Sequence, residues 1–555
     1  MRASRISDED ETTGLEKKSS IAWRPDRPAL RPTIWATHGA VTSGHPLATQ
    51  AGLRVLQAGG NAMDAAITMA AVLAVVRPHM NGLGGDAFAI FYDAVTDELV
   101  GLNASGRSAA TATPEAFAEL GLRKVPRRGP LSVTVPGAVS GWAATLERFG
   151  TLSLAQALGP AIDYATAGFP VSAKLHQDIA SEQQLLAQDA RAAGIFLCQG
   201  QAPPVGTLLR QPGLAASLEM VADQGPSALY GGAIGQAIVD RLDAVGGLLC
   251  LEDMVAHQAD WVEPLQTDYE NVDVAVLPPN SQGMALLLEL NLAAQFDIAA
   301  MGIDSAETVH HMVEIVKLAF RERDRHVTDA DFHRAPLERL LSEEYAARLA
   351  ATLDPDHAST EVANGASAIR RADTVYLAAF DSAGNMVSWI QSLYMSFGSG
   401  VIAGDTGIVL QNRGALFSLD TGDINVVAPR KRTYHTLSPA MVLRDRRPWM
   451  AIGTPGGDSQ TQTILQVLLR LLSSDLDPQA AVEAPRWRLQ PTGELLIEDA
   501  FADEVCRRLG ELGHRLRVLP TARLESFGGL QLIRVENNSI AAAADSRREA
   551  TALGW

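Results

Sequence analysis

The chain has 555 residues, of which 47% are hydrophobic and 20% are charged. This composition is typical of a soluble globular protein that can bury a large core. The net charge of −18 argues against nucleic acid as a partner, because phosphate binding needs a basic surface. A small anionic ligand is not excluded, since a local group of arginines can outweigh the overall charge.

The N-terminal segment and the cysteines bear on location. Residues 1–35 are charged and then proline-rich, so we expect a disordered leader. The first residues lack an apolar signal-type segment, and no apolar run reaches the roughly 18 residues of a membrane span. Cys198, Cys250 and Cys506 lie far apart and show no disulfide or metal spacing. We therefore expect a cytoplasmic enzyme with reduced thiols and no membrane contact.

The first half of the chain predicts a few strands and many helices. Expected strands are Ala36–Val41 and the pair Ala87–Asp93 and Glu98–Asn103, which follow a glycine turn at Gly82–Asp86. Expected helices are Ala48–Ala58, Ala62–Val76, Ser140–Phe149, Leu154–Ala167, Gly213–Gln224, Ala233–Val245, Met284–Phe296 and Glu307–Arg325.

The second half opens with a polar stretch, Asp354–Asp373, that has no periodic apolar pattern and predicts an exposed loop. A β-hairpin follows over Thr374–Tyr394 and turns at Asp381–Asn385. Further expected strands are Val401–Gln411, Ala440–Leu443, Trp449–Ile452, and the pair Leu530–Glu536 and Ser539–Ala543, with a helix at Thr461–Leu472. The fold class is α/β, with sheets sandwiched between helical layers.

Thr374 stands where the polar loop becomes a strand, a place where threonine is ordinarily structural. Its hydroxyl is a poor nucleophile unless a base removes the proton. If the Asp373–Thr374 bond is cut, the new α-amino group supplies that base, because its pKa of about 7.7–8.0 leaves part of it neutral. The preceding loop offers a cleavable segment. We therefore interpret Thr374 as a candidate N-terminal nucleophile.

Two further features support this interpretation. Gly456 and Gly457 lie between an expected strand and helix, where backbone N–H groups can stabilise an oxyanion. A plain glycine turn is the alternative, and a Walker-type phosphate loop is not indicated because no Gly-Lys-Ser/Thr follows. Ser392, in the second strand of the hairpin, could return beside Thr374 and orient it.

Five motifs in order resemble the γ-glutamyltransferase (γ-glutamyltranspeptidase) family of N-terminal-nucleophile hydrolases. They are Gly59–Ala66, Gly82–Asp86, Asp373–Tyr376, Phe397–Gly400 and Thr454–Gly457. Each motif is weak alone, but five in order at these separations are strong. The resemblance runs from about residue 36 to the C-terminus.

The resemblance implies a self-cleaving proenzyme with a four-layer αββα fold. Residues 36–373 would form the large subunit and residues 374–555 the small catalytic subunit, held together as a heterodimer in one compact unit. A further dimer of these heterodimers is left open. Thr374 would attack a γ-glutamyl amide, and water or an amine acceptor would resolve the acyl-enzyme. Ser392 stands where the family has a supporting threonine, and Gly456 and Gly457 match its oxyanion glycines.

The substrate-recognition positions depart from the family pattern. Where the family holds the glutamyl α-amino group with Asn, Gln and Asp, this chain has Tyr394, Arg413 and Leu416. An arginine prefers a carboxylate to an ammonium group, so the pocket favours an anionic acyl group. A structural salt bridge is the alternative for Arg413.

The family's carboxylate-binding residues are also replaced. Arg107 could substitute for the family's arginine, and the Ser-Ser pair becomes His435-Thr436, with a structural role as the alternative for His435. The chain therefore resembles a divergent branch that includes γ-glutamyltransferase-like proteins, cephalosporin acylases and oxamate amidohydrolase. The expected activity is glutathione hydrolase-like or that of a related amidohydrolase, on a γ-glutamyl amide or on an acyl group without an α-amino group.

Two other functions remain as alternatives. A non-catalytic relative would be expected to have lost Thr374, Ser392 or the glycine pair, and all are present. A metal hydrolase is weakly indicated, because His310-His311 and Asp329/Asp331 show no spacing such as H-E-x-x-H. We expect no cofactor and no metal.

Overall fold

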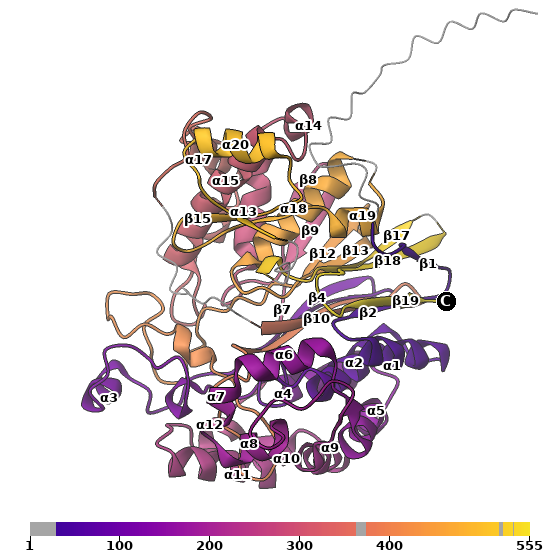
Figure 1. The fold of residues 1–555 in the computed structure, drawn as a ribbon, viewed down its shortest axis with the longest axis vertical. Helices are drawn as coiled ribbons and strands as arrows, with labels where there is room; N and C mark the ends of the chain where they lie inside the picture. Colours follow the sequence, from indigo (N-terminus) through magenta and orange to yellow (C-terminus); the bar gives the residue numbers. More distant parts are fainter. Residues whose placement is uncertain (1–28, 362–372, 475, 521–525, 537) are drawn as a thin grey trace, which may run out of the picture.

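Two seven-stranded antiparallel sheets lie face to face at the centre of the molecule (Figure 1). The structure is a computed structural model that describes residues 29–361, 373–474, 476–520, 526–536 and 538–555. In order across the first sheet, the strands are β1 (Ile34–Ala36), β18 (Ser539–Ala544), β17 (Gln531–Glu536), β13 (Arg447–Gly453), β12 (Ala440–Arg444), β9 (Val272–Val276) and β8 (Leu265–Tyr269). In the second they are β19 (Thr551–Gly554), β2 (Ala40–Ser43), β10 (Asp373–Phe380), β11 (Met386–Tyr394), β3 (Asp86–Asp93), β4 (Glu98–Ala104) and β7 (Asp260–Val262).

Helices cover the outer face of each sheet, as Figure 1 shows. The second sheet is covered by α1 (Pro46–Gln57), α2 (Ala62–Val76) and α4 (Ala138–Phe149), with α5 (Leu154–Ala167), α9 (Pro212–Gln224) and α11 (Ala233–Ala244) further out. The first sheet is covered by α13 (Gly283–Ala293), α18 (Ser459–Ser473) and α19 (Pro478–Glu483), and α15 (Ala306–His326) packs on α13. This is the four-layer αββα arrangement that the resemblance implied.

Shorter elements complete the described chain. They are α3 (Pro114–Glu119), η1 (Pro130–Ser132), β5 (Phe169–Pro170), α6 (Ala173–Ser181), α7 (Gln183–Leu186), α8 (Ala190–Phe196), β6 (Leu208–Leu209), α10 (Ser227–Tyr230), α12 (Leu251–Val255), α14 (Ile298–Met301), α16 (Leu337–Leu340), α17 (Glu343–Ala350), η2 (Arg413–Leu416), β14 (Trp487–Leu489), β15 (Glu494–Glu498), α20 (Asp503–Glu511) and β16 (Arg515–Leu519). Strands β14, β15 and β16 form a separate small sheet.

Strand β10 shows how the sequence builds these layers. Side chains of a strand alternate between its two faces. Val375, Leu377 and Ala379 pack in the core against the helices, while Tyr376 and Ala378 pack in the core between the two sheets. Because both faces are covered, the strand is apolar or aromatic from Val375 to Phe380, and Thr374, its second residue, is buried as well.

Several predicted elements agree with the structure and two do not. The helices Ala62–Val76 and Leu154–Ala167 have the predicted bounds, and the Thr374–Tyr394 hairpin is β10 and β11. The predicted strand Ala36–Val41 is wrong, because the chain breaks between β1 and β2, where the N–H groups of Thr37 and His38 both donate to the carbonyl of Trp555.

The predicted strand Val401–Gln411 is also wrong. Only an isolated bridge joins Ile402 to Val409, because Gly404 and Gly407 adopt positive φ angles of 57° and 71° and turn the chain. Strand β1 begins inside the predicted leader 1–35, of which residues 1–28 lie outside the described part. Of the predicted loop 354–373, residues 362–372 lie outside it as well.

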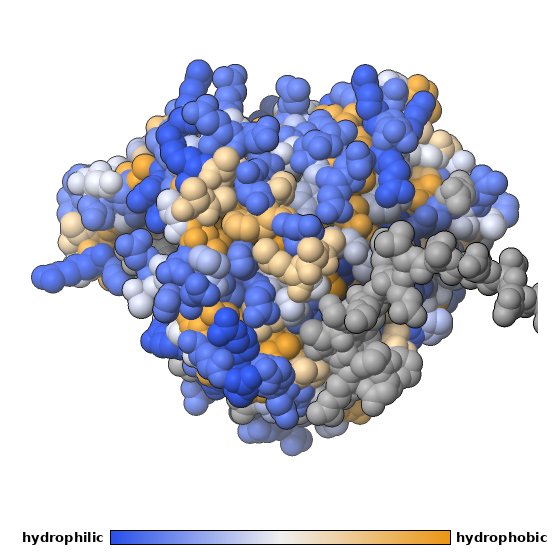
Figure 2. All heavy atoms as spheres, turned by 90° about the horizontal axis from the view of Figure 1, so that it is seen from above, coloured by the Kyte–Doolittle hydropathy of each residue, from blue (hydrophilic) through white to orange (hydrophobic). Residues whose placement is uncertain are grey.

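The molecular surface on one side is mostly hydrophilic, with smaller apolar patches between polar side chains (Figure 2). Among the described residues, no helix has both the length and the apolar character needed to cross a membrane.

Candidate active site

The hairpin of β10 and β11 brings Thr374 and Ser392 together. Thr374 Oγ1 lies 3.1 Å from Ser392 Oγ, and both side chains are buried. The Ser392 hydroxyl donates to the carbonyl of Asp373, at 2.7 Å, and accepts from the backbone N–H of Tyr394, at 2.8 Å. With its one proton on the Asp373 carbonyl, Ser392 is left as an acceptor for the Thr374 hydroxyl. The predicted nucleophile therefore lies beside the peptide bond that it is predicted to cut.

Tyr394 is held in an unusual conformation at the end of β11. Its φ is +79°, a region that a bulky residue rarely adopts. The pairing of β10 with β11 sets Tyr394 opposite Asp373, with a register shift between Asp373 and Val375. The guanidinium carbon of Arg413 lies 4.2 Å from the centre of the Tyr394 ring. Tyr394 thus lies next to the cleavage site, and Arg413 lies against the Tyr394 ring.

Arg413 is fully buried in η2 and has few partners. Its Nη1 donates to Thr436 Oγ1 at 3.2 Å, while its Nε and Nη2 have no hydrogen-bond partner among the described residues. Burial lowers the pKa of Arg413 to about 10, and the nearby Asp86 opposes that effect. The guanidinium is therefore still charged at neutral pH.

His435 is completely buried against Asp86. Its Nε2 lies 3.1 Å from Asp86 Oδ2, and its Nδ1 accepts the N–H of Leu437, so the neutral ring carries its proton on Nε2. Burial and the charge of Arg413 hold the pKa of His435 well below its usual value. Burial also raises the pKa of Asp86 to about 6. His435 is thus a neutral donor to a buried carboxylate.

Gly456 and Gly457 form the turn that leads into α18. Their φ angles are +145° and +61°. Only glycine readily adopts the first of these angles. Gln282 holds this turn, since its side-chain amide donates to the carbonyls of Gly457 and of Thr436 at 3.1 and 2.7 Å. Gln282 thereby links the glycine turn to Thr436, whose hydroxyl accepts a hydrogen bond from Arg413.

Arg548 joins the same turn to the cleavage site from the other side. Its Nη1 lies 3.9 Å from Asp373 Oδ1, and its Nε donates to the carbonyl of Gly528. A Cβ on Gly528 would lie 2.6 Å from Thr454 Oγ1 and 3.0 Å from the carbonyl oxygen of Pro455. The chain at Gly528 therefore packs directly on the Thr454–Gly457 motif.

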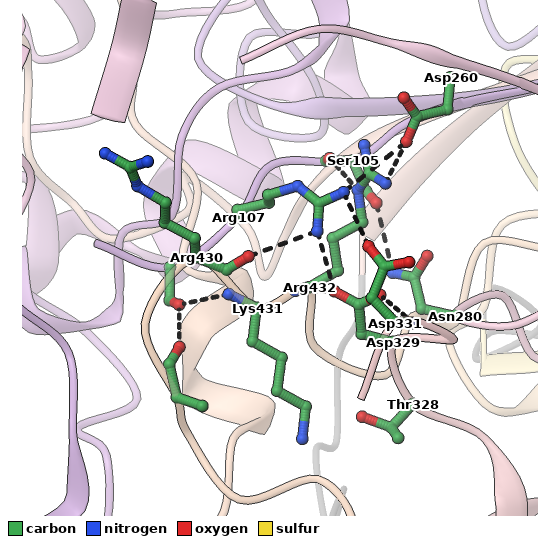
Figure 3. Close-up of polar contacts among 12 residues, drawn as sticks. Ser105, Arg107, Asp260, Asn280, Thr328, Asp329, Asp331, Arg430, Lys431 and Arg432 are labelled. Atoms are coloured by element: carbon green, nitrogen blue, oxygen red, sulfur yellow. Dashed lines mark hydrogen bonds and ion pairs between the residues drawn. The ribbon is translucent and has the colours of Figure 1, made fainter. Parts of the chain in front are cut away.

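Arg107 takes part in a separate charge network, shown in Figure 3. Its guanidinium lies 3.1 Å from Asp329, 3.4 Å from Asp331 and 3.9 Å from Asp260. With Arg430 it lines a cavity of about 320 Å³. No contact joins its side chain to Thr374, Ser392 or Arg413 in the described part of the chain. The arrangement is that of a carboxylate-paired arginine, and a role of Arg107 in substrate binding stays a prediction.

Sequence reasoning missed Asp86, Gln282 and Arg548. Asp86 ends the predicted Gly82–Asp86 turn, whose role in the site was not predicted, and Gln282 immediately precedes α13. Nothing in their spacing signals that Asp86 and Gln282 meet residues of the predicted small subunit, or that Arg548 of that subunit meets Asp373. Their partners become visible only when the two halves pack together.

A histidine cluster lies elsewhere, between the two predicted subunits. His310, Glu314 and His514 offer nitrogen and oxygen atoms within 4.8 Å of one another, a set that could ligate a metal. These atoms already have partners, because His310 Nδ1 meets His514 Nε2 at 2.8 Å and Glu314 pairs with Lys317 at 2.7 Å. The Lys317 ammonium also opposes a cation there.

The comparisons with known proteins settle the family. The family model described as gamma-glutamyltranspeptidase matches residues 48–555. The chain belongs to the gamma-glutamyltranspeptidase family. It is 41% identical over 532 residues to the glutathione hydrolase-like YwrD proenzyme of Bacillus subtilis, covering 95% of this chain and all of that one. It is 36% identical over 531 residues to the oxamate amidohydrolase proenzyme of Klebsiella pneumoniae, covering 94% of this chain and 99% of that one.

Similar solved structures agree with this family assignment. The cephalosporin acylase of Bacillus halodurans superposes with a TM-score of 0.88 at 36% identity, covering 96% of this chain and 98% of that one. The gamma-glutamyltranspeptidase of Helicobacter pylori gives a TM-score of 0.56 at 28% identity, over 60% of this chain and 95% of that one. The protein is therefore a self-processing hydrolase of the N-terminal-nucleophile type that acts on small amides and is cleaved into two chains. Pairing of these heterodimers stays a prediction.

Proposed function

We propose that the mature enzyme hydrolyses a small amide whose acyl group bears a carboxylate, through an acyl-enzyme on Thr374. The observation that carries this proposal is the position of the Thr374 hydroxyl, 3.1 Å from Ser392 Oγ and next to the Asp373 carbonyl. The names of the relatives support two acyl classes, a γ-glutamyl group and an acyl group without an α-amino group.

Self-cleavage begins when Thr374 Oγ attacks the Asp373 carbonyl carbon. Ser392 donates its proton toward the carbonyl oxygen, which gains negative charge in the tetrahedral intermediate. The C–N bond then breaks, the Thr374 nitrogen takes the proton that the Thr374 hydroxyl gave up, and an ester joins Asp373 to the Thr374 oxygen. Water hydrolyses that ester, which releases the Asp373 carboxylate and a free threonine amine.

Turnover then repeats the chemistry on an external amide. The Thr374 amine accepts the hydroxyl proton, directly or through water, and Oγ attacks the substrate carbonyl. The N–H groups of the Gly456–Gly457 turn would stabilise the oxyanion at the start of α18. The amine product leaves with the proton. Water or an amine acceptor resolves the ester and restores the threonine.

Denaturing electrophoresis with N-terminal sequencing tests this function. We expect two bands, the smaller beginning at Thr374, and hydrolysis of carboxyacyl amides by the purified protein. Thr374→Ala is expected to remain a single chain without amidase activity. A wild-type protein that stays full-length and hydrolyses no such amide would contradict the proposal.

A further inference from the structure

Arg413 presents one complete edge of its guanidinium without a partner. The two unpaired nitrogens, Nε and Nη2, lie on the same side of the planar group and form the edge that binds a carboxylate with two parallel hydrogen bonds. The side chain is only 1% exposed. Buried polar groups almost always have partners, and an unpaired buried charge is strongly destabilising. A free buried edge of this kind is expected where a ligand completes the pairing.

The neighbouring carboxylates of the described chain do not fill this role, because none of them forms a hydrogen bond with Nε or Nη2 of Arg413. Asp86 is the nearby charge with the largest effect on Arg413. Its Oδ1 accepts from Gly106 N and Gln411 Nε2 at 2.9 and 3.0 Å, and its Oδ2 lies 3.1 Å from His435 Nε2. Asp458 likewise accepts the hydroxyl proton of Tyr434 at 3.0 Å. These carboxylates offset the charge of Arg413 without occupying its free edge.

A chain of contacts through Tyr394 and Ser392 links Arg413 to the nucleophile. Arg413 stacks on the Tyr394 ring, and the N–H of Tyr394 donates to Ser392, which contacts Thr374. In the uncleaved chain Asp373 pairs with Tyr394 across the hairpin. Cleavage detaches Asp373 from Thr374 and leaves it at the end of the other fragment. Asp373, which pairs with Tyr394, is then no longer bonded to the strand that begins with Thr374.

Leu416 shows what this corner does not bind. Residues three apart in a 3₁₀-helix lie on the same side, so Leu416 shares a face of η2 with Arg413. Its side chain is buried in the same apolar cluster as Tyr394 and offers no acceptor to an ammonium group. Together with the cationic guanidinium, this surface favours an anion and opposes a cation.

We infer that Arg413 binds the carboxylate of the acyl group through its Nε and Nη2 edge, and that the preferred acyl group carries a carboxylate and no amino group. The ligand class is a monoamide of a simple dicarboxylic acid. This inference rests on the proposed hydrolase function and names its substrate class. Arg413 is then the specificity-determining residue of the acyl pocket.

Anilide substrates that differ by one group test the inference. The p-nitroanilides of oxalic, succinic and glutaric acid vary the chain length. The γ-glutamyl anilide adds only an α-amino group to the glutaryl one, and the butyryl anilide lacks only its carboxylate. We expect the best carboxyacyl anilide to exceed both the γ-glutamyl and the butyryl anilide at least tenfold in kcat/KM.

Arg413→Gln should remove this preference selectively. A hydrogen-bonded charged pair contributes about 10-fold to 100-fold, so the carboxyacyl rates should fall by that factor. Self-cleavage and butyryl turnover are measured on the same preparation, and the ratio of carboxyacyl to butyryl kcat/KM should fall by that same factor. Arg413→Lys keeps the charge but loses the paired edge, so its carboxyacyl kcat/KM should also fall about 10-fold. This variant replaces Arg413→Gln in the test if the glutamine variant does not fold.

Leu416→Asp, with Leu416→Asn as its uncharged control, should lower carboxyacyl hydrolysis and raise the relative rate on the γ-glutamyl anilide.

The inference is overturned if γ-glutamyl hydrolysis by the wild type equals or exceeds the best carboxyacyl rate. It is also overturned if Arg413→Gln cuts itself normally yet loses all substrates equally. Either result leaves the hydrolase proposal standing, whereas absent self-cleavage and absent turnover in the wild type would refute that proposal instead.

Discussion

Ser392 Oγ lies between Thr374 and the peptide bond that precedes it, 3.1 Å from Thr374 Oγ1 and 2.7 Å from the Asp373 carbonyl oxygen. The same hydroxyl accepts the N–H of Tyr394. Its single proton is therefore directed to the Asp373 carbonyl, and its lone pairs face two donors. This places a hydrogen-bond donor where negative charge develops during self-cleavage.

Ser392→Ala is expected to slow self-cleavage by about 100-fold, because it removes the donor to the developing oxyanion. The conversion of full-length protein into two bands, followed over time after purification, measures this. Ser392→Thr keeps the hydroxyl and should still cleave at a rate within about tenfold of the wild type. Cleavage of the alanine variant at the wild-type rate would show that Ser392 does not act on this carbonyl.

Gly456→Ala is expected to lower amidase activity by at least about 100-fold. Its φ of +145° is inaccessible to alanine, and the added Cβ would lie 2.5 Å from Ser459 Oγ, so the turn must move. Gly206→Ala is the matched control, since Gly206 also has a positive φ, +84°, but its Cβ would meet nothing within 4 Å. Steady-state kinetics and melting temperature, measured on both, separate a displaced oxyanion site from general strain. Equal activity in the two variants would argue against a role for Gly456.

Local sequence patterns predicted the part of the site that lies on one hairpin. A turn at Asp381–Asn385 and two apolar strands were enough to place Ser392 beside Thr374, because a tight turn fixes the register of its strands. Helix α2 was equally predictable, since Asn61 and Asp64 form a capping box at its start.

The remaining contacts depend on residues that are distant in the sequence. Asp86 and His435 are 349 residues apart and meet only after both halves fold. Arg107 was a plausible carboxylate receptor in sequence, but Asp329 and Asp331 lie beyond the reach of any local pattern and pair with it. Periodicity predicts which face of an element is buried, and it does not predict which charged residue pairs with which.

Glu289→Gln is expected to stabilise the enzyme at alkaline pH. Glu289 is fully buried in α13; its Oε1 accepts from Thr461 at 2.9 Å, and its Oε2 has no partner among the described residues. Burial raises its pKa from 4.5 to about 8. Folding thus favours the protonated acid, and stability present below about pH 4.5 is lost as the pH rises through about 8.

Glutamine is neutral at every pH. The free energy of unfolding of Glu289→Gln relative to the wild type should therefore increase between pH 4.5 and 8 and stay constant above that range. The difference in melting temperature should reach a few degrees at pH 9. Glu147→Gln, at an exposed position, is the control and should show no such trend. A pH-independent difference for Glu289→Gln would contradict ionisation of this carboxyl as the cause.

His514→Gln is expected to make the mature heterodimer less sensitive to acid. His310 lies in the predicted large subunit and His514 in the predicted small one. His310 Nε2 donates to the Asp354 carbonyl at 2.8 Å, so its Nδ1 accepts the Nε2 proton of His514. Burial lowers the pKa of both rings, that of His514 to about 3, and Lys317 lowers both further. Stability is then present above the ordinary pKa of 6.5 and is lost as the pH falls toward 3.

The glutamine side chain places an N–H near the same point and does not titrate. The melting temperatures of the wild type and of His514→Gln should therefore nearly coincide at pH 8, while at pH 5 the wild type should lose several degrees more. Parallel curves of melting temperature against pH would show that this pair does not link acid to subunit stability.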